Sequence, residues 1–249
     1  MTPQAECIEE PAAASLEGIS QRSQVNRGNC CERKGNKAMQ EAVAFIKSRQ
    51  PVNLAIVVTN ILVFLILSVM GDTENGYFML MHGASYAPYV TEYGEYYRLL
   101  TCMFLHFGIQ HLFNNMLVLM FLGDEVEKMA GKLRFLAIYF VGGLAGNLIS
   151  VAYDMYTADY RVSAGASGAI FSVIGALLAV VLLNRGKIPA YTKKRMFLMA
   201  SLSVLQGLTA TGVDNCAHIG GLICGFLLAL LFHRKLTFED RIPVEDFQG

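Results

Sequence analysis

Charged residues are scarce in this chain. They make up 16% of its 249 residues, whereas 54% are hydrophobic, and the mean hydropathy is +0.41. The formal net charge is zero, so nothing in the composition indicates nucleic acid as a partner. The apolar residues lie in long blocks rather than alternating with polar ones, which indicates an all-α, polytopic membrane protein.

Tryptophan is absent, and so is any regular spacing of cysteine. The 6 cysteines form no Cys-x-x-Cys pair, which argues against a zinc site and against a disulfide framework. We therefore expect neither a metal nor a cofactor. A cleavable signal peptide is not expected either, because the first apolar run begins about 50 residues along the chain.

Six apolar blocks are long enough to cross a membrane as helices. The first, Val52 to Met70, has about 19 residues and a helical length of roughly 28 Å, close to the hydrocarbon thickness of a bilayer. The segment between the first two blocks, 71–108, holds more than half of the 11 tyrosines, as is typical of a membrane–water interface. The other predicted spans are 109–127, 133–153, 167–184, 196–212 and 215–233.

The domain organisation and the orientation follow from these spans. We expect a six-helix domain over 51–233, a polar cytoplasmic tail over 1–50 with a short interfacial helix near 39–49, and a cytoplasmic tail over 234–249. Of the 20 Lys and Arg residues, all but Arg98 and Arg161 fall on one side of the predicted membrane domain. By the positive-inside rule that side is cytoplasmic, so the even-numbered helices begin at the outer surface.

The stretch Gly165-Ala166-Ser167-Gly168 opens the fourth predicted span. It places a serine at the start of a helix without a polar face, where free backbone N–H groups and the positive end of the helix dipole lie. A hydroxyl held there can attack a carbonyl and have the resulting oxyanion stabilised in place. Small residues at the start of a membrane helix also serve close packing, and the stretch alone does not separate the two interpretations.

Further polar side chains fall at a similar shallow depth on the outer side. His218 lies about one turn into the sixth span, and His111 and Asn115 share one face of the second. Polar groups at that depth are costly unless they face one another or water. The arrangement favours Ser167 as a nucleophile with His218 as its base, and no triad, because Asp214 lies nearer water. His111 and Asn115 would donate hydrogen bonds to the oxyanion, although all three side chains also fit structural roles between packed helices.

These motifs resemble those of the rhomboid intramembrane serine proteases. The matching stretches are His-Leu-Phe-Asn-Asn at 111–115, Gly-Ala-Ser-Gly at 165–168 and Ala-His-Ile-Gly-Gly at 217–221, in this order on the second, fourth and sixth spans. The resemblance covers essentially the whole predicted membrane domain. It implies a six-helix rhomboid-like bundle whose water-filled cavity opens to the outer side. It also implies a dyad of Ser167 and His218, an oxyanion site at His111 and Asn115, and supporting positions at Gly165, Gly168, Asn215 and Phe171, with His106 near the site and Glu127 at the inner end of the second helix.

Two positions depart from the family pattern. The Trp-Arg pair of the family's first loop appears here as Tyr97-Arg98, so the anchoring of that loop differs in its aromatic member. Where some members carry a tyrosine one turn after the serine, Phe171 stands here. Its ring can still pack on His218, but any hydrogen-bonding role of a hydroxyl is lost.

The sequence therefore predicts an intramembrane serine endopeptidase that hydrolyses peptide bonds in or near transmembrane segments. The resemblance implies that membrane-protein substrates enter laterally from the lipid, between the second and fifth helices. The expected location is a bacterial plasma membrane, in which the protein is a multi-pass component with no nucleic-acid or metal partner. The alternative is a catalytically silent rhomboid-like protein that binds membrane-protein clients. A small transporter or channel fits less well, because the sequence has no internal inverted repeat.

Overall fold

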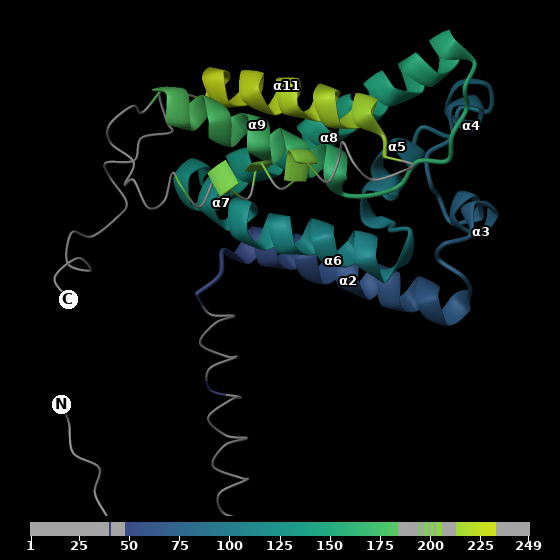
Figure 1. Cartoon of the computed structure of the whole chain (residues 1–249), viewed down its shortest axis with the longest axis horizontal. Helices are drawn as coiled ribbons and strands as arrows, with labels where there is room; N and C mark the ends of the chain where they lie inside the picture. Colours follow the sequence, from purple (N-terminus) through teal and green to yellow (C-terminus); the bar gives the residue numbers. More distant parts are fainter. Residues whose placement is uncertain are drawn as a thin grey trace, which may run out of the picture. The chain divides into compact units, whose positions relative to one another are not determined.

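The computed structural model describes residues 48–183 and 213–232, together with positions 40, 194, 197, 198, 200, 201 and 203–205. The contacts divide the chain into two units, Met1–Arg49 and Gln50–Gly249. The predicted interfacial helix near 39–49, the fifth predicted span at 196–212 and both predicted tails lie largely or wholly outside the described residues. The ribbon of the second unit is shown in Figure 1.

The described residues are helical apart from their connections and one isolated antiparallel bridge between Ser85 and Ser163. This confirms the all-α prediction. The helices are α2 (Pro51–Met70), α3 (Gly76–Met81), α4 (Ala87–Thr91), α5 (Arg98–Thr101), the 3₁₀ turn η1 (Cys102–Phe104), α6 (Gly108–Val118), the π-helical turn η2 (Leu119–Gly123), α7 (Asp124–Ala130), α8 (Lys132–Thr157), α9 (Ser167–Leu183) and α11 (Asn215–Leu231).

Two of the described helices, α2 and α8, are long and apolar enough to cross a membrane, and the chain is an integral membrane protein on that composition. A third span results if the bent pair 98–104 and 108–130, which turns by 91°, is counted as one. The apolar helices α9 and α11 have 17 residues each and are shorter. The count of six spans stays a prediction.

Helix α2 begins at Pro51, whose missing N–H would be unsatisfied at this position in any case, and ends where the N–H of Gly71 donates to the carbonyl of Leu67 (3.0 Å). One face of the helix is buried and the other is apolar and exposed. Leu62, Leu65 and Ile66 belong to the exposed face, as expected where a helix meets lipid chains.

The second predicted span begins at Gly108, close to the expected start, but it is not a single regular helix. The π-helical turn η2 interrupts it, and the helix then continues to Ala130. The side-chain amide of Asn53 in α2 fills this interruption: it donates to the carbonyl of Leu119 (3.0 Å) and to Asp124 (2.8 Å). The carboxylate of Glu127 accepts from the backbone N–H of Asn53 (2.7 Å), so polar contacts fix α2 against this span at one end.

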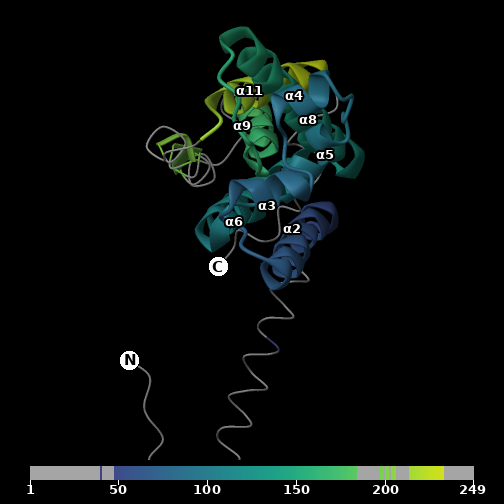
Figure 2. The ribbon, with the colours of Figure 1, turned by 90° about the vertical axis from the view of Figure 1, so that its right-hand side faces the viewer.

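Helices α8, α9 and α11 form the core of the unit. Nearly the whole circumference of α9 is buried, and Figures 1 and 2 show α9 alongside α11. Glycines bring the two backbones together. A Cβ on Gly225 would collide with the carbonyl oxygen of Ser172, and a Cβ on Gly221 with that of Gly168. Small residues therefore permit the contact between these two helices.

The segment between α2 and α6 is organised around Arg98, whose side chain is buried. Its Nη1 donates to the carbonyls of Leu80 (2.6 Å) and Ala84 (2.9 Å). Its Nε donates to the carboxylate of Glu95, and this hydrogen bond lowers the pKa of that carboxyl. The guanidinium also lies 4.9 Å from the ring centre of Tyr89. Arg98 thus anchors the loop even though no tryptophan precedes it.

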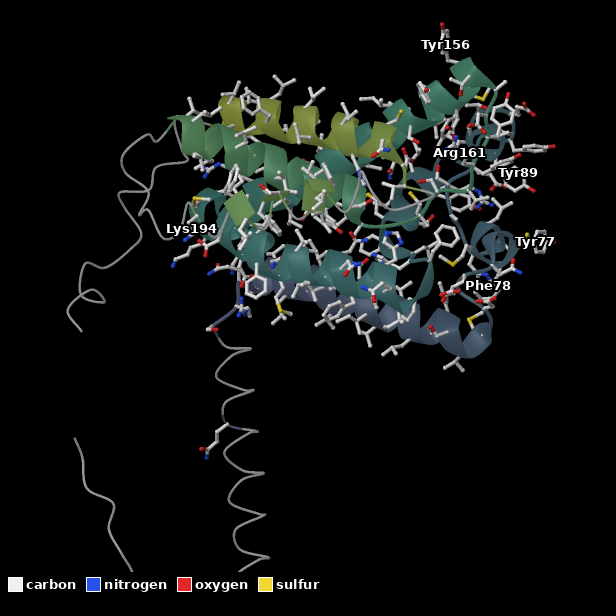
Figure 3. The ribbon with its side chains drawn as sticks, in the orientation of Figure 1. Tyr77, Phe78, Tyr89, Tyr156, Arg161 and Lys194 are labelled. Carbon is white, nitrogen blue, oxygen red and sulfur yellow. The ribbon has the colours of Figure 1, made fainter. Side chains whose placement is uncertain are left out.

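The two ends of the second unit differ in composition. Figure 3 shows Tyr77, Tyr89 and Arg161 at one end and Lys194 at the other. The tyrosine-rich end also carries Tyr156, which is 88% exposed. Exposed tyrosines at this level are typical of a membrane–water interface.

Replacing Gly225 by alanine tests the packing of α11 on α9. The new methyl group meets the backbone of Ser172, which cannot move aside without separating the helices, so Gly225→Ala should lower the free energy of unfolding by about 1–3 kcal/mol. Circular dichroism during denaturation in mixed micelles measures this. A Cβ on Gly76 has no heavy atom within 4 Å, so Gly76→Ala is the matched control and should have little effect. Equal stability of both variants would contradict the packing argument.

The role of Arg98 is tested by Arg98→Lys. Lysine keeps the charge, but its single nitrogen cannot replace both Nη1, which serves the two carbonyls, and Nε, which serves Glu95. At least one of these acceptors then loses its partner, at a cost of about 1–3 kcal/mol. The same denaturation experiment measures the loss. Arg161→Lys is the control, because the Arg161 side chain is 67% exposed and pairs with exposed Asp159. A loss no larger for Arg98→Lys than for Arg161→Lys would count against the anchor.

Candidate active site

A cavity of about 810 Å³ lies among α6, α8, α9 and α11. Its walls gather side chains from regions far apart in the sequence. All of the candidate residues line it: Ser167, His218, His111, Asn115, Gly165, Gly168, Asn215 and Phe171.

Ser167 is the first residue of α9, and its side chain is partly accessible from the cavity. The preceding Gly165 has a φ of +143°, a conformation that favours glycine. A Cβ built on Gly165 would lie 2.8 Å from Cε1 of His111 and 3.6 Å from the Ser167 hydroxyl oxygen. The bare backbone at Gly165 therefore leaves room for the imidazole and the hydroxyl on the same side of the turn. The N–H of Gly165 donates to the carbonyl of Cys102 (2.9 Å), which holds the turn in place.

His218 lies in the first turn of α11, and only 6% of its surface is exposed. Its ring stacks on that of Phe171, with the centroids 4.1 Å apart and the planes 9° from parallel. The backbone N–H of Ala217 donates to the side chain of Asp214 (2.9 Å), so Asp214 is the N-cap of this helix. The imidazole is thus held by the Phe171 ring, which stacks on it, and by the capped first turn of α11, to which His218 belongs.

No hydrogen bond joins the Ser167 hydroxyl to the His218 ring within the described part of the chain. The structure brings both groups to one cavity but does not close the contact between them. Hydrogen bonds of catalytic pairs are often long without substrate and tighten when substrate binds.

His111 and Asn115 lie one turn apart on α6 and both face the cavity. The ring of His111 makes an edge contact with His106, whose side chain is fully buried, at 5.2 Å between centroids. The Nδ2 of Asn115 is buried and finds no acceptor among the described residues. Because Asn115 lines the cavity, this donor is available to a group bound there.

Several polar residues of the cavity wall lie outside the motifs, among them Asn147, Ser150 and Ser163. Asn147 donates from Nδ2 to the carbonyl of Leu99 (2.7 Å) and to the sulfur of Cys102 (3.1 Å). Ser150 and Ser163 both donate to Asp214. The signal for Asn147 and Ser150 was present in the sequence, because polar residues within an apolar span usually face a partner or a cavity. Nothing comparable marks Ser163, which lies in a connection.

The part of the chain that the structure describes contains no group of three or more His, Cys, Asp and Glu side chains arranged to hold a metal ion. The polar groups of the cavity include hydroxyls, imidazoles, amides and carboxylates. Such a set is suited to proton transfer and to the stabilisation of an anion.

Comparison with known proteins places these motifs in a family. The family model described as the rhomboid domain matches residues 93–235, more than half of the chain. Rhomboid protease GluP of Bacillus subtilis is 36% identical over 189 residues, which are 76% of this chain and 36% of that protein. RHOMBOID-like protein 5 of Arabidopsis thaliana is 38% identical over 146 residues, covering 57% of this chain and 46% of the relative.

A shorter relative matches over more of its own length. The putative rhomboid protease YdcA of Bacillus subtilis is 38% identical over 143 residues, which are 57% of this chain and 70% of that protein. The chain thus spans less than half of the length of GluP and of the Arabidopsis protein. The matched region of the family model runs from the segment before α5 through α11 and includes every residue of the candidate site. The chain belongs to the rhomboid family of polytopic membrane proteins.

Proposed function

We propose that this protein is an intramembrane serine endopeptidase that cleaves membrane proteins in or near their transmembrane segments. The observation that supports this most is the cavity that Ser167, His218, His111 and Asn115 share. The names of relatives such as rhomboid protease GluP agree with a proteolytic activity.

In the proposed reaction the hydroxyl oxygen of Ser167 attacks the scissile carbonyl carbon, while His218 takes the hydroxyl proton. The carbonyl π-electrons move to oxygen, and the resulting anion lies near the side-chain donors of His111 and Asn115 and the N-terminus of α9. His218 then gives the proton to the leaving amine, so that an acyl-enzyme remains. A water molecule, deprotonated by His218, then attacks the carbonyl carbon of this ester. The bond to the Ser167 oxygen breaks, His218 returns the proton to that oxygen, and the new C-terminal fragment leaves as a carboxylic acid.

The position of the site explains why a membrane helix must unwind to be cut. Backbone groups of a transmembrane helix are hydrogen-bonded internally, so a buried carbonyl is not accessible to Ser167. We infer that substrates enter from the bilayer and that residues which weaken a helix, such as glycine, favour cleavage. The polar lining of the cavity would satisfy the backbone groups that unwinding exposes.

The proposed orientation in a bacterial plasma membrane has both termini in the cytoplasm. The asymmetry of Lys and Arg residues supports it. The positions of Lys194 and of Arg161 at opposite ends of the unit agree with it (Figure 3). The candidate site would then lie toward the outer surface.

Substitution of the nucleophile is the direct test. Purified protein in detergent, given a synthetic transmembrane substrate, should cleave it, and Ser167→Ala should reduce cleavage below detection. A fluorophosphonate probe should label the wild-type protein and leave Ser167→Ala unlabelled. Cleavage by Ser167→Ala at the wild-type rate would refute the assignment, and a wild type that binds substrate without cleaving it would favour the client-binding alternative.

The anion site is tested by Asn115→Ala. Loss of one donor to a developing oxyanion typically slows the chemical step, so kcat should fall by roughly 10²–10³ at most, with little change in KM. Asn114→Ala is the matched control, because the Asn114 side chain already accepts a hydrogen bond from Gln110 (3.0 Å), and it should lose much less. A similar loss in both variants would argue against a specific role for Asn115.

A further inference from the structure

The carboxylate of Asp214 joins three separate segments beside the candidate site. Its Oδ1 accepts a hydrogen bond from the backbone N–H of Ala217 in the first turn of α11 (2.9 Å). Its Oδ2 accepts from the hydroxyl of Ser150 in α8 (2.5 Å) and from the hydroxyl of Ser163, in the connection before α9 (2.8 Å). One side chain therefore holds two helices and the connection together.

Two of these hydrogen-bonded residues, Ser163 and Asp214, have matching positions in the sequence relative to the two candidate catalytic residues. Ser163 stands four residues before Ser167, and Asp214 stands four residues before His218. The backbone N–H of His218 donates to the carbonyl of Asp214 (3.1 Å), so the cap and the histidine share the first turn of the helix. The hydrogen bond from Ser163 to Asp214 thus ties the segment that carries the hydroxyl to the segment that carries the imidazole.

Ser163 is also fixed from its other side. Its backbone N–H and carbonyl form two hydrogen bonds with those of Ser85, each 2.8 Å long. The neighbouring carbonyl of Ala84 accepts a hydrogen bond from buried Arg98 (2.9 Å). A continuous set of hydrogen bonds therefore runs from Arg98 to Asp214. It passes through Ser163, in the connection that leads into α9.

We propose that Asp214 is a positioning residue, which sets the distance between the Ser167 hydroxyl and the His218 ring through Ser163 and the cap of α11. This inference rests on the proposed function, because it concerns the reaction of the same site. Among the described residues the carboxylate of Asp214 accepts hydrogen bonds from Ala217, Ser150 and Ser163 and not from Ser167 or the His218 ring. Its effect comes from geometry, and a displacement of about 1 Å between reacting groups lowers rates by up to roughly 10²-fold.

A carboxylate suits this position for two reasons. Both of its oxygens accept hydrogen bonds, and a charged acceptor forms stronger hydrogen bonds than a neutral one. Its negative charge also lies at the N-terminus of α11, where the helix dipole stabilises it. The helices offer little freedom at this level, because a Cβ on Gly146 of α8 would meet the carbonyl oxygen of Ala217 at 2.5 Å. Of the three segments, the connection before α9 is therefore the one whose position depends on the hydrogen bond of the Ser163 hydroxyl.

The test removes the hydroxyl of Ser163 and leaves Asp214 in place. Ser163→Ala should lower kcat by about 10-fold or more, with KM nearly unchanged, because substrate binding is intact and only the spacing of the reacting groups is lost. The rate of labelling by a fluorophosphonate probe, which needs no substrate helix, should fall in parallel. Ser163→Thr restores a hydroxyl and should recover most of the wild-type kcat.

The matched control is Ser172→Ala. The hydroxyl of Ser172 is buried and donates to the carbonyl of Ile138 (2.6 Å), so this variant also loses one side-chain hydrogen bond, but this bond does not involve Asp214. The variant should show a similar loss of thermal stability and a kcat close to that of the wild type. The double variant of Ser163→Ala with Asp214→Asn should lose less than the product of the single effects, because both changes remove the same link.

An unchanged kcat in Ser163→Ala, or an equal fall in Ser172→Ala, would overturn the positioning role. If Asp214→Asn does not fold, the comparison of Ser163→Ala, Ser163→Thr and Ser172→Ala decides alone. A wild-type protein that cleaves its substrate while Ser163→Ala is equally active overturns this inference only. A wild type without any activity would overturn the proposed function and this inference together.

Discussion

The close contact of α9 with α11 is the constraint on which the candidate site depends. Lipid chains are as apolar as leucine side chains, so the hydrophobic effect does little to press two membrane helices together. Glycines at 221 and 225 instead let the backbone of α11 approach the carbonyl groups of α9. This approach brings the first turn of one helix beside the first turn of the other. The hydroxyl of Ser167 and the ring of His218 share a cavity as a result.

Polar groups within an apolar bundle must find partners, and this requirement explains much of the remaining structure. Asn53 and Glu127 pair across the end of the unit that is distant from the cavity, and the amide of Asn53 supports a π-helical turn. Arg98 satisfies the carbonyls of the tyrosine-rich segment. Asn115 differs in its place, because its buried amide nitrogen has no acceptor among the described residues and the residue lines the cavity. A donor in that position is available to a bound group.

Much of this arrangement could be predicted from residue patterns. The apolar blocks gave α2, α8, α9 and α11 with boundaries within a few residues, because an uninterrupted apolar run in lipid has few alternatives to a helix. The motifs around His111, Ser167 and His218 identified part of the cavity lining, and residues such as Asn147 and Ser163 lie outside them. The interruption at η2 was not predicted, because it depends on an amide from α2, far away in the sequence. The hydrogen bond from Ser163 to Asp214 was not predicted for the same reason, because the two residues lie far apart in the sequence.

The sequence by itself determined that the chain is helical, that its apolar runs suit a membrane and that its motifs resemble those of the rhomboid family. These properties follow from composition, from apolar length and from local motifs. Only the tertiary structure decided which contacts hold those residues, such as the hydrogen bond from Ser163 to Asp214 and the close approach of Gly165 to His111. Such contacts join residues far apart along the chain or on different turns. Their distances depend on how closely whole helices approach, and no local pattern records that.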